Sequence, residues 1–364
     1  MYRLSSWYKK YVKNGVEMKI EDRLIGVNYE PYIIAEMSGN HNQSLERALK
    51  IVEAASKAGA HAVKLQTYTA DTMTLDTKKG EFFINDEKSL WNGNSLHDLY
   101  SKAYTPWEWH KSIINRAKEL GMSCFSSPFD ESAVDFLEGL DVVAYKIASF
   151  ENNHLPLIKK VANTGKPVII STGMASIDEI HEAVVTARNA GCKDLTLLKC
   201  TSTYPANPKN SNILTIPHMQ ELFGCEVGLS DHTMGIGVSI AAIAHGATII
   251  EKHFTLSRAD GGVDSAFSIE PKELNMLVEE TKRAWECLGK PSYGPTKDEE
   301  KSLQFRRSIY ISENMKKGEI LSKDNIRIVR PGFGLHPRYY DSLLGKKVKN
   351  NLLKGTPISM DFIE

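Results

Sequence analysis

The stretch YIIAEMSGNHNQSLERALKIVEAASKAGAHAVKLQTY, residues 32–68, contains one complete strand–helix–strand unit. Its two end runs, YIIAEM (32–37) and AVKLQ (62–66), are largely apolar on successive residues, which is typical of parallel strands covered on both faces. Between them, apolar residues recur at helical spacing over 44–57, after a Ser44 that suits an N-cap and before a Gly59 that suits the residue beyond a helix. The stretch therefore predicts two parallel strands joined by a helix that packs on them.

The same unit recurs along the chain. Six further runs of the same kind follow the first two: MSCFSS (122–127), VVAYKIAS (142–149), PVIIST (167–172), LTLLKC (195–200), EVGLSD (226–231) and TIIEKHF (248–254). Eight alternating units predict an α/β fold, a (β/α)₈ TIM barrel, which we place at residues 25–290. An open doubly wound sheet is the alternative, but it normally has a glycine-rich phosphate turn after an early strand, and the chain has none.

The segments outside the barrel differ from it in composition. Residues 1–24 are expected to form an N-terminal extension, a solvated and lysine-rich arm as far as Ile20 that lacks the apolar core of a secretory signal. Residues 291–303 have the polar, proline- and glycine-containing composition of a linker. Residues 304–364 repeat a motif, KGEILSKDNI (317–326) and KGTPISMDFI (354–363), and predict a small β-rich domain that packs on a barrel, its own or a neighbour's.

One connection inside the barrel is unusually long. Residues 71–104 follow the second predicted strand, so they lie on the face where such barrels keep their active sites. A connection of this length in a compact domain is usually functional, and we expect a lid or a binding element.

The composition excludes several classes of function. The 45 basic and 45 acidic residues cancel, whereas nucleic-acid binding needs a cationic excess. No apolar run is long enough to span a membrane, so no membrane partner is expected. The five cysteines are scattered and include no C-x-x-C pair, which disfavours a disulfide framework or a thiolate zinc site and favours a reducing, cytoplasmic location.

Polar residues gather where the predicted strands end, and in a barrel these ends share one mouth. Two lysines there imply an anionic guest or carboxylate partners, because a buried ammonium is costly unless it is paired. Two histidines on adjacent strands, with Glu36 or Asp231 nearby, can bind a divalent first-row metal, although a hydrogen-bonded pair in a polar cleft is also possible. The strand-end candidates are Glu36, Lys64, Gln66, Ser127, Lys146, Ser149, Ser171, Tyr204, Ser230, His232 and His253.

At these residues the chain resembles the sialic acid synthase family of phosphoenolpyruvate-condensing barrels. The resemblance covers nearly the whole chain from Tyr32 onward, and the tail resembles the antifreeze-like (SAF) domain of that family. AEMSGNHNQS (35–44), LQTYTADTMTLD (65–76) and RPGFGLHP (330–337), together with Ser202 in place of an asparagine, are most similar to the pseudaminic acid synthases within the family. The other motifs are VKLQTY (63–68), YKIASFE (145–151), STGMAS (171–176), CTSTYP (200–205), GLSDHT (228–233) and EKHFTL (251–256).

The resemblance implies an activity and a role for each matching residue. It implies condensation of phosphoenolpyruvate with 2,4-diacetamido-2,4,6-trideoxy-altropyranose to give pseudaminic acid and phosphate, in a homodimer that exchanges its SAF domains. It assigns a divalent metal, Mn²⁺, to His232 and His253, and an acid/base or electrostatic role to Glu36. It further implies that phosphoenolpyruvate is held by Lys64, Gln66, Ser127, Lys146, Ser149, Ser171 and Ser230, and the sugar by Tyr204, Asp264 and, from the partner's SAF domain, Arg330.

Three other functions stay open at the level of sequence. An N-acetylneuraminate or legionaminate synthase would share the catalytic residues and differ in the sugar. An aldolase with a Schiff-base lysine is a different reaction, and a non-catalytic sugar-binding barrel is a different class of protein.

Overall fold

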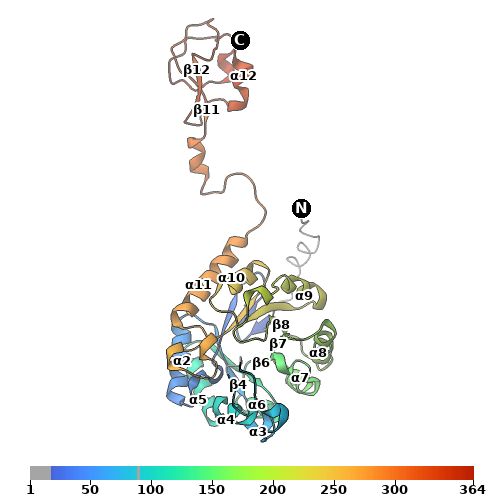
Figure 1. The fold of residues 1–364 in the computed structure, drawn as a ribbon. Helices are drawn as coiled ribbons and strands as arrows, with labels where there is room; N and C mark the ends of the chain where they lie inside the picture. Colours follow the sequence, from blue (N-terminus) through green and yellow to red (C-terminus); the bar gives the residue numbers. More distant parts are fainter. Residues whose placement is uncertain (1–17, 88–90) are drawn as a thin grey trace. The chain divides into compact units, whose positions relative to one another are not determined.

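The computed structural model describes residues 18–87 and 91–364 and contains a closed barrel of eight parallel strands in the order β10-β3-β4-β5-β6-β7-β8-β9 (Figure 1). This confirms the predicted (β/α)₈ barrel. The strands coincide with the eight apolar runs: β3 (Tyr32–Glu36), β4 (Ala62–Thr67), β5 (Ser123–Pro128), β6 (Tyr145–Ile147), β7 (Val168–Ser171), β8 (Leu195–Cys200), β9 (Glu226–Asp231) and β10 (Ile249–His253).

Eight helices follow the strands in turn and surround the barrel in Figure 1. The first of them shows why the chain folds locally as it does, because Ser44 accepts a hydrogen bond from the backbone N–H of Arg47 at its start. No helix in the described part of the chain is long and apolar enough to cross a bilayer. The helices are α2 (Leu45–Lys57), α5 (His110–Glu119), α6 (Glu131–Gly139), α7 (Leu155–Ala162), α8 (Ile177–Asn189), α9 (Thr215–Phe223), α10 (Gly237–Ala244) and α11 (Pro271–Leu288).

Along each strand, side chains alternate between the barrel interior and the surrounding helices. On β10, Ile249 packs in the inner apolar cluster and Glu251 contacts other interior side chains, whereas Lys252, the residue after Glu251, pairs with Asp231 at 3.0 Å. The lower interior is apolar, with Ile34 and Phe125 among its buried members, and the polar side chains lie above it toward the strand ends. The alternation thus decides which polar residues reach the mouth of the barrel.

A short hairpin that precedes the first barrel strand packs against the inner apolar cluster of the barrel. Its strands β1 (Met18–Ile20) and β2 (Arg23–Ile25) pair antiparallel, and Met18 and Ile20 are 1% and 0% exposed within the same cluster as the inner barrel residues. The expectation of a solvated arm is therefore wrong for Met18 and Ile20, because their side chains are buried in the barrel core, whereas Lys19 between them is exposed. The rest of that predicted extension, residues 1–17, lies outside the described residues.

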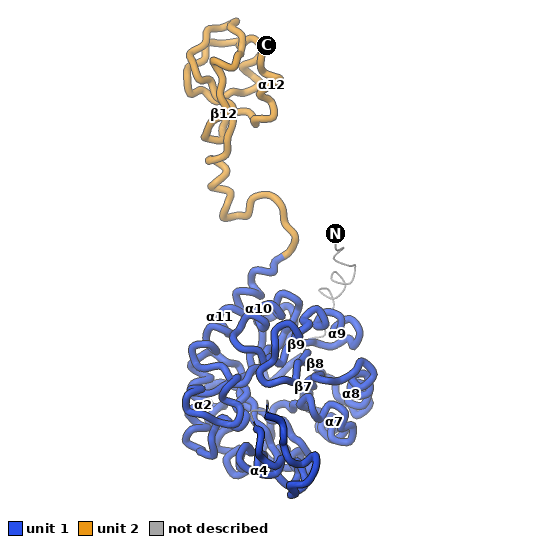
Figure 2. Tube along the Cα trace, viewed as in Figure 1, with its two compact units in different colours: residues 1–289 blue, residues 290–364 orange. Residues whose placement is uncertain are grey.

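The chain divides into two compact units, the first ending at Gly289 and the second running from Lys290 to Glu364 (Figure 2). The second unit contains the antiparallel pair β11 (Ser308–Ile311) and β12 (Ile326–Val329) and the short helix α12 (Tyr340–Leu343).

The repeat in the second unit has a structural counterpart in its core. Leu321 and Ile358 occupy equivalent positions of the two motifs, as do Ile326 and Ile363, and all four are buried in one apolar cluster. Gly318 and its equivalent Gly355 have φ of +85° and +88°, a left-handed conformation that glycine adopts without strain. Each motif therefore supplies a turn and two core residues to the same small core.

Candidate functional site

A cavity of about 480 Å³ lies at the carboxyl ends of the barrel strands. Its lining includes side chains from β3, β4, β6, β7, β9 and β10 and from the segments that follow β5 and β8. This is the position in which TIM barrels build active sites, and the volume is in the range of small-molecule sites.

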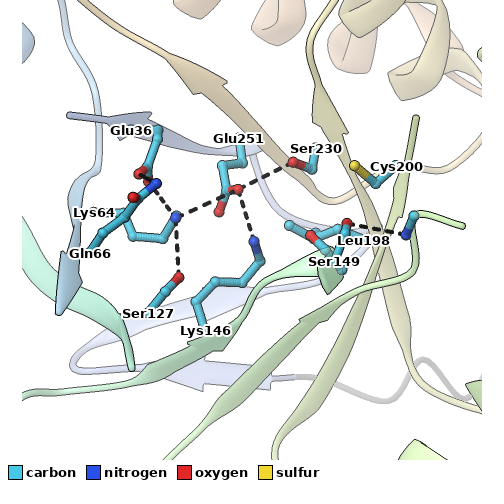
Figure 3. Close-up of polar contacts among 12 residues, drawn as sticks. Glu36, Lys64, Gln66, Ser127, Lys146, Ser149, Leu198, Cys200, Ser230 and Glu251 are labelled. Carbon is cyan, nitrogen blue, oxygen red and sulfur yellow. Dashed lines mark hydrogen bonds and ion pairs between the residues drawn. The ribbon is translucent and has the colours of Figure 1, made fainter. Parts of the chain in front are cut away.

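Two lysines and two glutamates form a buried charge cluster in this cavity (Figure 3). Lys64 Nζ forms an ion pair with Glu36 Oε2 and lies 3.9 Å from Glu251 Oε1. Lys146 Nζ donates to Glu251 Oε1 at 3.0 Å. None of the four side chains is more than 5% exposed, so each charge depends on the others for compensation.

Neutral side chains add hydrogen bonds to the cluster, although Glu251 Oε2 has no hydrogen-bond partner among the described residues. Gln66 Nε2 donates to Glu36 Oε1 at 3.0 Å, and Ser230 Oγ donates to Glu251 Oε1 at 3.2 Å. Lys64 Nζ donates to Ser127 Oγ at 3.3 Å. These partners hold the charged groups in fixed positions before any ligand binds, which is the preorganisation that electrostatic catalysis requires.

The cluster shifts the protonation of its members. Burial raises the pKa of Glu36 to about 7, although Lys64 opposes the shift. Burial also acts on Glu251, but Lys146 and Lys64 outweigh it and the pKa of Glu251 is lowered. Burial lowers the pKa of Lys146 despite its contact with Glu251. Glu251 is therefore the constant negative charge of the cluster, whereas Glu36 can gain and lose a proton near neutral pH.

His232 and His253 come together at the ends of β9 and β10, with ring centroids 5.3 Å apart. His232 Nδ1 lies 3.1 Å from the carbonyl oxygen of Thr201, which can only accept, so Nδ1 carries a hydrogen and, in the neutral imidazole, Nε2 has the lone pair. Burial lowers the pKa of His253 well below its usual value, which keeps this imidazole neutral. Its Nδ1 is buried without a hydrogen-bond partner among the described residues, 3.9 Å from Asp264 Oδ2.

These two imidazoles suit a divalent first-row metal ion. They are nitrogen donors of the right kind, one of them is oriented by a backbone carbonyl, and the other has an unpaired buried nitrogen. Among residues 18–87 and 91–364, no group of three His, Cys, Asp or Glu side chains is placed to hold a metal by itself. The pair therefore fits a metal whose remaining positions are open to substrate or water.

Further buried polar atoms around the cavity have no hydrogen-bond partner in the described part of the chain. Ser171 Oγ and Glu151 Oε2 are both of this kind, and both residues line the cavity. Burial raises the pKa of Glu151 to about 7. Ser149 Oγ accepts a hydrogen bond from the backbone N–H of Gly173 at 3.2 Å. Unpaired buried groups in a cavity indicate that a polar ligand completes them.

The predicted sugar-contacting residues lie in different parts of the molecule. The Tyr204 ring lies 4.5 Å from the ring of His232 and lines the cavity. Asp264 also lines it and accepts a hydrogen bond from Ser38 Oγ. Arg330 belongs to the second unit, where it follows β12 and is exposed.

One residue considered for the metal site faces the other way. Asp231 accepts hydrogen bonds from Thr233 and Ser239 and pairs with Lys252, all outside the barrel interior. The suggestion that Asp231 lies beside the histidines as a ligand is therefore wrong, because the side chains of neighbouring strand residues point to opposite faces.

Two carboxylates that line the cavity were missed by the sequence reasoning. Glu251 precedes His253 by two residues, and this period-2 spacing could have placed it on the same inner face. Glu151 lies two residues after Ser149 in the 3₁₀ turn Ser149–Glu151, where no strand alternation applies. It could have been found only as an acidic residue directly after a strand end.

The long connection after β4 also contributes to the cavity, as expected for a binding element. It contains the short helix α3 (Ala70–Met73) and the helix α4 (Leu96–Ala103). Met73, Ile84 and Leu99 from this segment line the cavity beside the polar residues of the strand ends.

Comparisons with known proteins agree with this architecture. The model of the NeuB family matches residues 51–293, and that of the SAF domain matches residues 306–364. A pseudaminic acid synthase of Campylobacter jejuni is 44% identical over 324 residues, 89% of this chain and 94% of that protein. A pseudaminic acid synthase of Helicobacter pylori is 43% identical over 336 residues, 92% of this chain and 98% of that protein.

A solved structure shows the same fold. The N-acetylneuraminic acid (sialic acid) synthetase of Leptospira borgpetersenii, crystallised in complex with citrate, is 31% identical and superposes with a TM-score of 0.70. The match covers 80% of this chain and 96% of that one.

Proposed function

The chain belongs to the NeuB family, and from this membership and the geometry of its cavity we propose that it is a pseudaminic acid synthase. The observation that carries the proposal is the identity of 44% and 43% to two pseudaminic acid synthases, each covered over more than nine-tenths of its length. The resemblance seen in the sequence motifs is confirmed by the family match. The reaction joins phosphoenolpyruvate to 2,4-diacetamido-2,4,6-trideoxy-altropyranose and releases phosphate.

Phosphoenolpyruvate carries a phosphate and a carboxylate, and the cavity offers two ammonium groups to them. Lys64 and Lys146 are fixed by the carboxylates of Glu36 and Glu251 and need no reorganisation when the anion enters. A proton on Glu36, whose pKa is near 7, makes the four-residue cluster net positive and favours the anion. The unpaired hydroxyl of Ser171 is a further donor for a phosphate or carboxylate oxygen.

The bond changes of the reaction require proton transfers, which the remaining residues of the site must carry out. The methylene carbon of phosphoenolpyruvate forms a bond to the aldehyde carbon of the open-chain sugar, and the aldehyde oxygen takes up a proton. A water molecule adds to the carbon that bears the phosphate and loses one proton. The bond from that carbon to the phosphate oxygen then breaks, phosphate leaves with the electron pair, and the added oxygen loses its second proton as it becomes the keto oxygen. Glu36 and Glu151, both with a pKa near 7, are suited to give and take these protons.

A divalent metal, with Mn²⁺ as our proposal, would be held by His232 and His253. When bound, it would supply Lewis-acid polarisation of the aldehyde oxygen. Tyr204 packs against both imidazoles, at 4.5 and 6.2 Å between ring centroids, and keeps them and the reacting end of the sugar in place.

Two further proposals concern assembly and location. We propose a homodimer in which the second unit of one chain brings Arg330 to the cavity of the other, since Arg330 is exposed and its guanidinium can donate hydrogen bonds to the acyl groups of the sugar. We place the enzyme in the cytoplasm because all five cysteines are free thiols and four of them are buried.

The test is a phosphate-release assay on the purified full chain with Mn²⁺ and phosphoenolpyruvate. The sugars are the diacetamido 6-deoxy-altrose, its manno-configured counterpart and N-acetylmannosamine, each with and without EDTA. We expect EDTA-sensitive release with the altrose sugar. Release with another sugar alone would keep the chemistry and refute the assigned product, and no release with any sugar would refute synthase activity.

A separate experiment tests the lysines. Lys146→Met should lower kcat strongly, with Lys160→Met as the control because Lys160 pairs with exposed Asp135 on the surface. Near-normal turnover in Lys146→Met would contradict the anion-binding role.

A further inference from the structure

The cavity has two chemically different sides. One carries the buried charges and the histidines described above. The other is formed by apolar side chains of the segment after β4 together with Val263. Because the two sides belong to the same cavity, a ligand that enters meets both of them.

Helix α4 presents an apolar stripe to this cavity. Leu96, Leu99, Tyr100 and Ala103 follow the i, i+3, i+4, i+7 spacing of one helix face, and all four line the cavity. No residue of α4 is fully buried in protein. Tyr100 packs edge-on against Tyr68, with ring centroids 5.8 Å apart, and Ala103 lies next to Gly39. The part of the stripe left for a ligand to cover is therefore Leu96 and Leu99.

Neighbouring residues extend the stripe into a wall. Ile84 is held by two backbone hydrogen bonds, from its own N–H to the carbonyl of Asn94 and from the N–H of Gly93 to its carbonyl, both of 2.9 Å. Trp91 donates its indole N–H to the carbonyl of Val263 at 3.1 Å, so this donor is already used. We call Ile84, Leu96, Leu99 and Val263 the apolar wall; their side chains have no polar atom.

A row of rings connects the apolar wall to the histidines. The rings of Trp91 and Tyr204 are 6.1 Å apart, and those of Tyr204 and His232 are 4.5 Å apart. A sugar whose aldehyde end lies at the histidines therefore extends its far end along these rings toward the wall.

We propose that the apolar wall selects the sugar by its 6-deoxy methyl group and the methyl of its 4-acetamido group. This inference rests on the proposed function and names the part of the site that determines specificity. A methyl on the wall gains apolar burial, whereas a 6-hydroxyl in its place would lose its water without gaining a partner. Apolar pockets discriminate against an added hydroxyl by roughly 100-fold.

The test compares kcat/KM for the 6-deoxy sugar with kcat/KM for the same diacetamido sugar carrying a 6-hydroxyl. Wild type should favour the 6-deoxy sugar by about 100-fold, and Leu99→Asn should reduce this ratio at least 10-fold by placing an amide partner at the wall. The KM for phosphoenolpyruvate should not change, because the charged side is untouched. Leu75→Asn is the matched control, since Leu75 lies in the same segment but is 65% exposed and does not line the cavity.

A second variant distinguishes a change in sugar specificity from a general loss of activity. Leu99→Ala should lower kcat/KM for the 6-deoxy sugar without improving the 6-hydroxyl sugar. An unchanged ratio in Leu99→Asn, or an equal change in Leu75→Asn, overturns the role of the wall while synthase activity stands. A wild-type enzyme that turns over no acetamido-sugar overturns the proposed function instead.

Discussion

Removing the charge of Glu251 should show how much the buried carboxylates stabilise the buried lysines. Its Oε1 accepts from Lys146 Nζ at 3.0 Å and from Ser230 Oγ at 3.2 Å, and it lies 3.9 Å from Lys64 Nζ. Glu251→Gln keeps the size of the side chain and an oxygen acceptor but removes the negative charge. Lys64 keeps Glu36 as its partner, whereas Lys146 loses the carboxylate with which it forms an ion pair.

The expected loss follows from this geometry. Removing one partner of a buried ion pair costs roughly 3–5 kcal/mol, because it leaves an uncompensated buried charge. The amide oxygen can still accept from Lys146, so we expect the lower end, about 3 kcal/mol at pH 7. Burial already lowers the pKa of Lys146. The variant should therefore regain stability as the pH rises toward 10, where Lys146 folds in its neutral form.

The assay is urea unfolding followed by circular dichroism, at pH 7 and at pH 9.5. Glu251→Gln combined with Lys146→Met should recover most of the loss, because neither charge is then left alone. Asp135→Asn, which breaks the surface pair with Lys160, is the control and should cost at most about 1 kcal/mol. A loss below about 1 kcal/mol in Glu251→Gln, or a double variant as unstable as the sum of the singles, would refute the reasoning.

Three more outcomes are expected. In Gly173→Ala the new methyl would lie 2.1 Å from Ser202 Oγ. We therefore expect kcat/KM for phosphoenolpyruvate, measured by phosphate release, to fall at least about 10-fold. Wild-type kinetics in this variant would contradict the prediction. Burial raises the pKa of Glu151 to about 7, so the folded state binds an extra proton between the unfolded pKa and 7 and loses stability as the pH rises through that window. Glu151→Gln should flatten this fall in thermal unfolding between pH 5 and 8, and an unchanged slope would argue against it. Ile20→Asp places a charge in the barrel core and should lower the free energy of unfolding by about 3 kcal/mol or more. Leu24→Asp, at a position 37% exposed, should lower it far less. Equal losses of stability in denaturant unfolding would show that the hairpin is not part of the core.

Much of the architecture could be read from residue order. The eight apolar runs became the eight strands, because a parallel strand covered on both faces must be hydrophobic along its whole length. The repeated K-G motif of the second unit led to equivalent turns and core positions, since a left-handed turn requires glycine and a core requires spaced apolar residues. The concentration of polar residues after the strands pointed to the correct end of the barrel.

The tertiary structure alone decided which polar residues act together. A strand that is apolar on both faces carries no alternation in its sequence, so the sequence could not show that Ser230 points inward and Asp231 outward. Barrel closure made that choice and brought Glu251 to Lys146 from 105 residues away along the chain. The surroundings of the Met18–Ile20 strand and of the α4 stripe also follow from the tertiary structure alone. What a short apolar segment packs against depends on the space that distant elements leave for it.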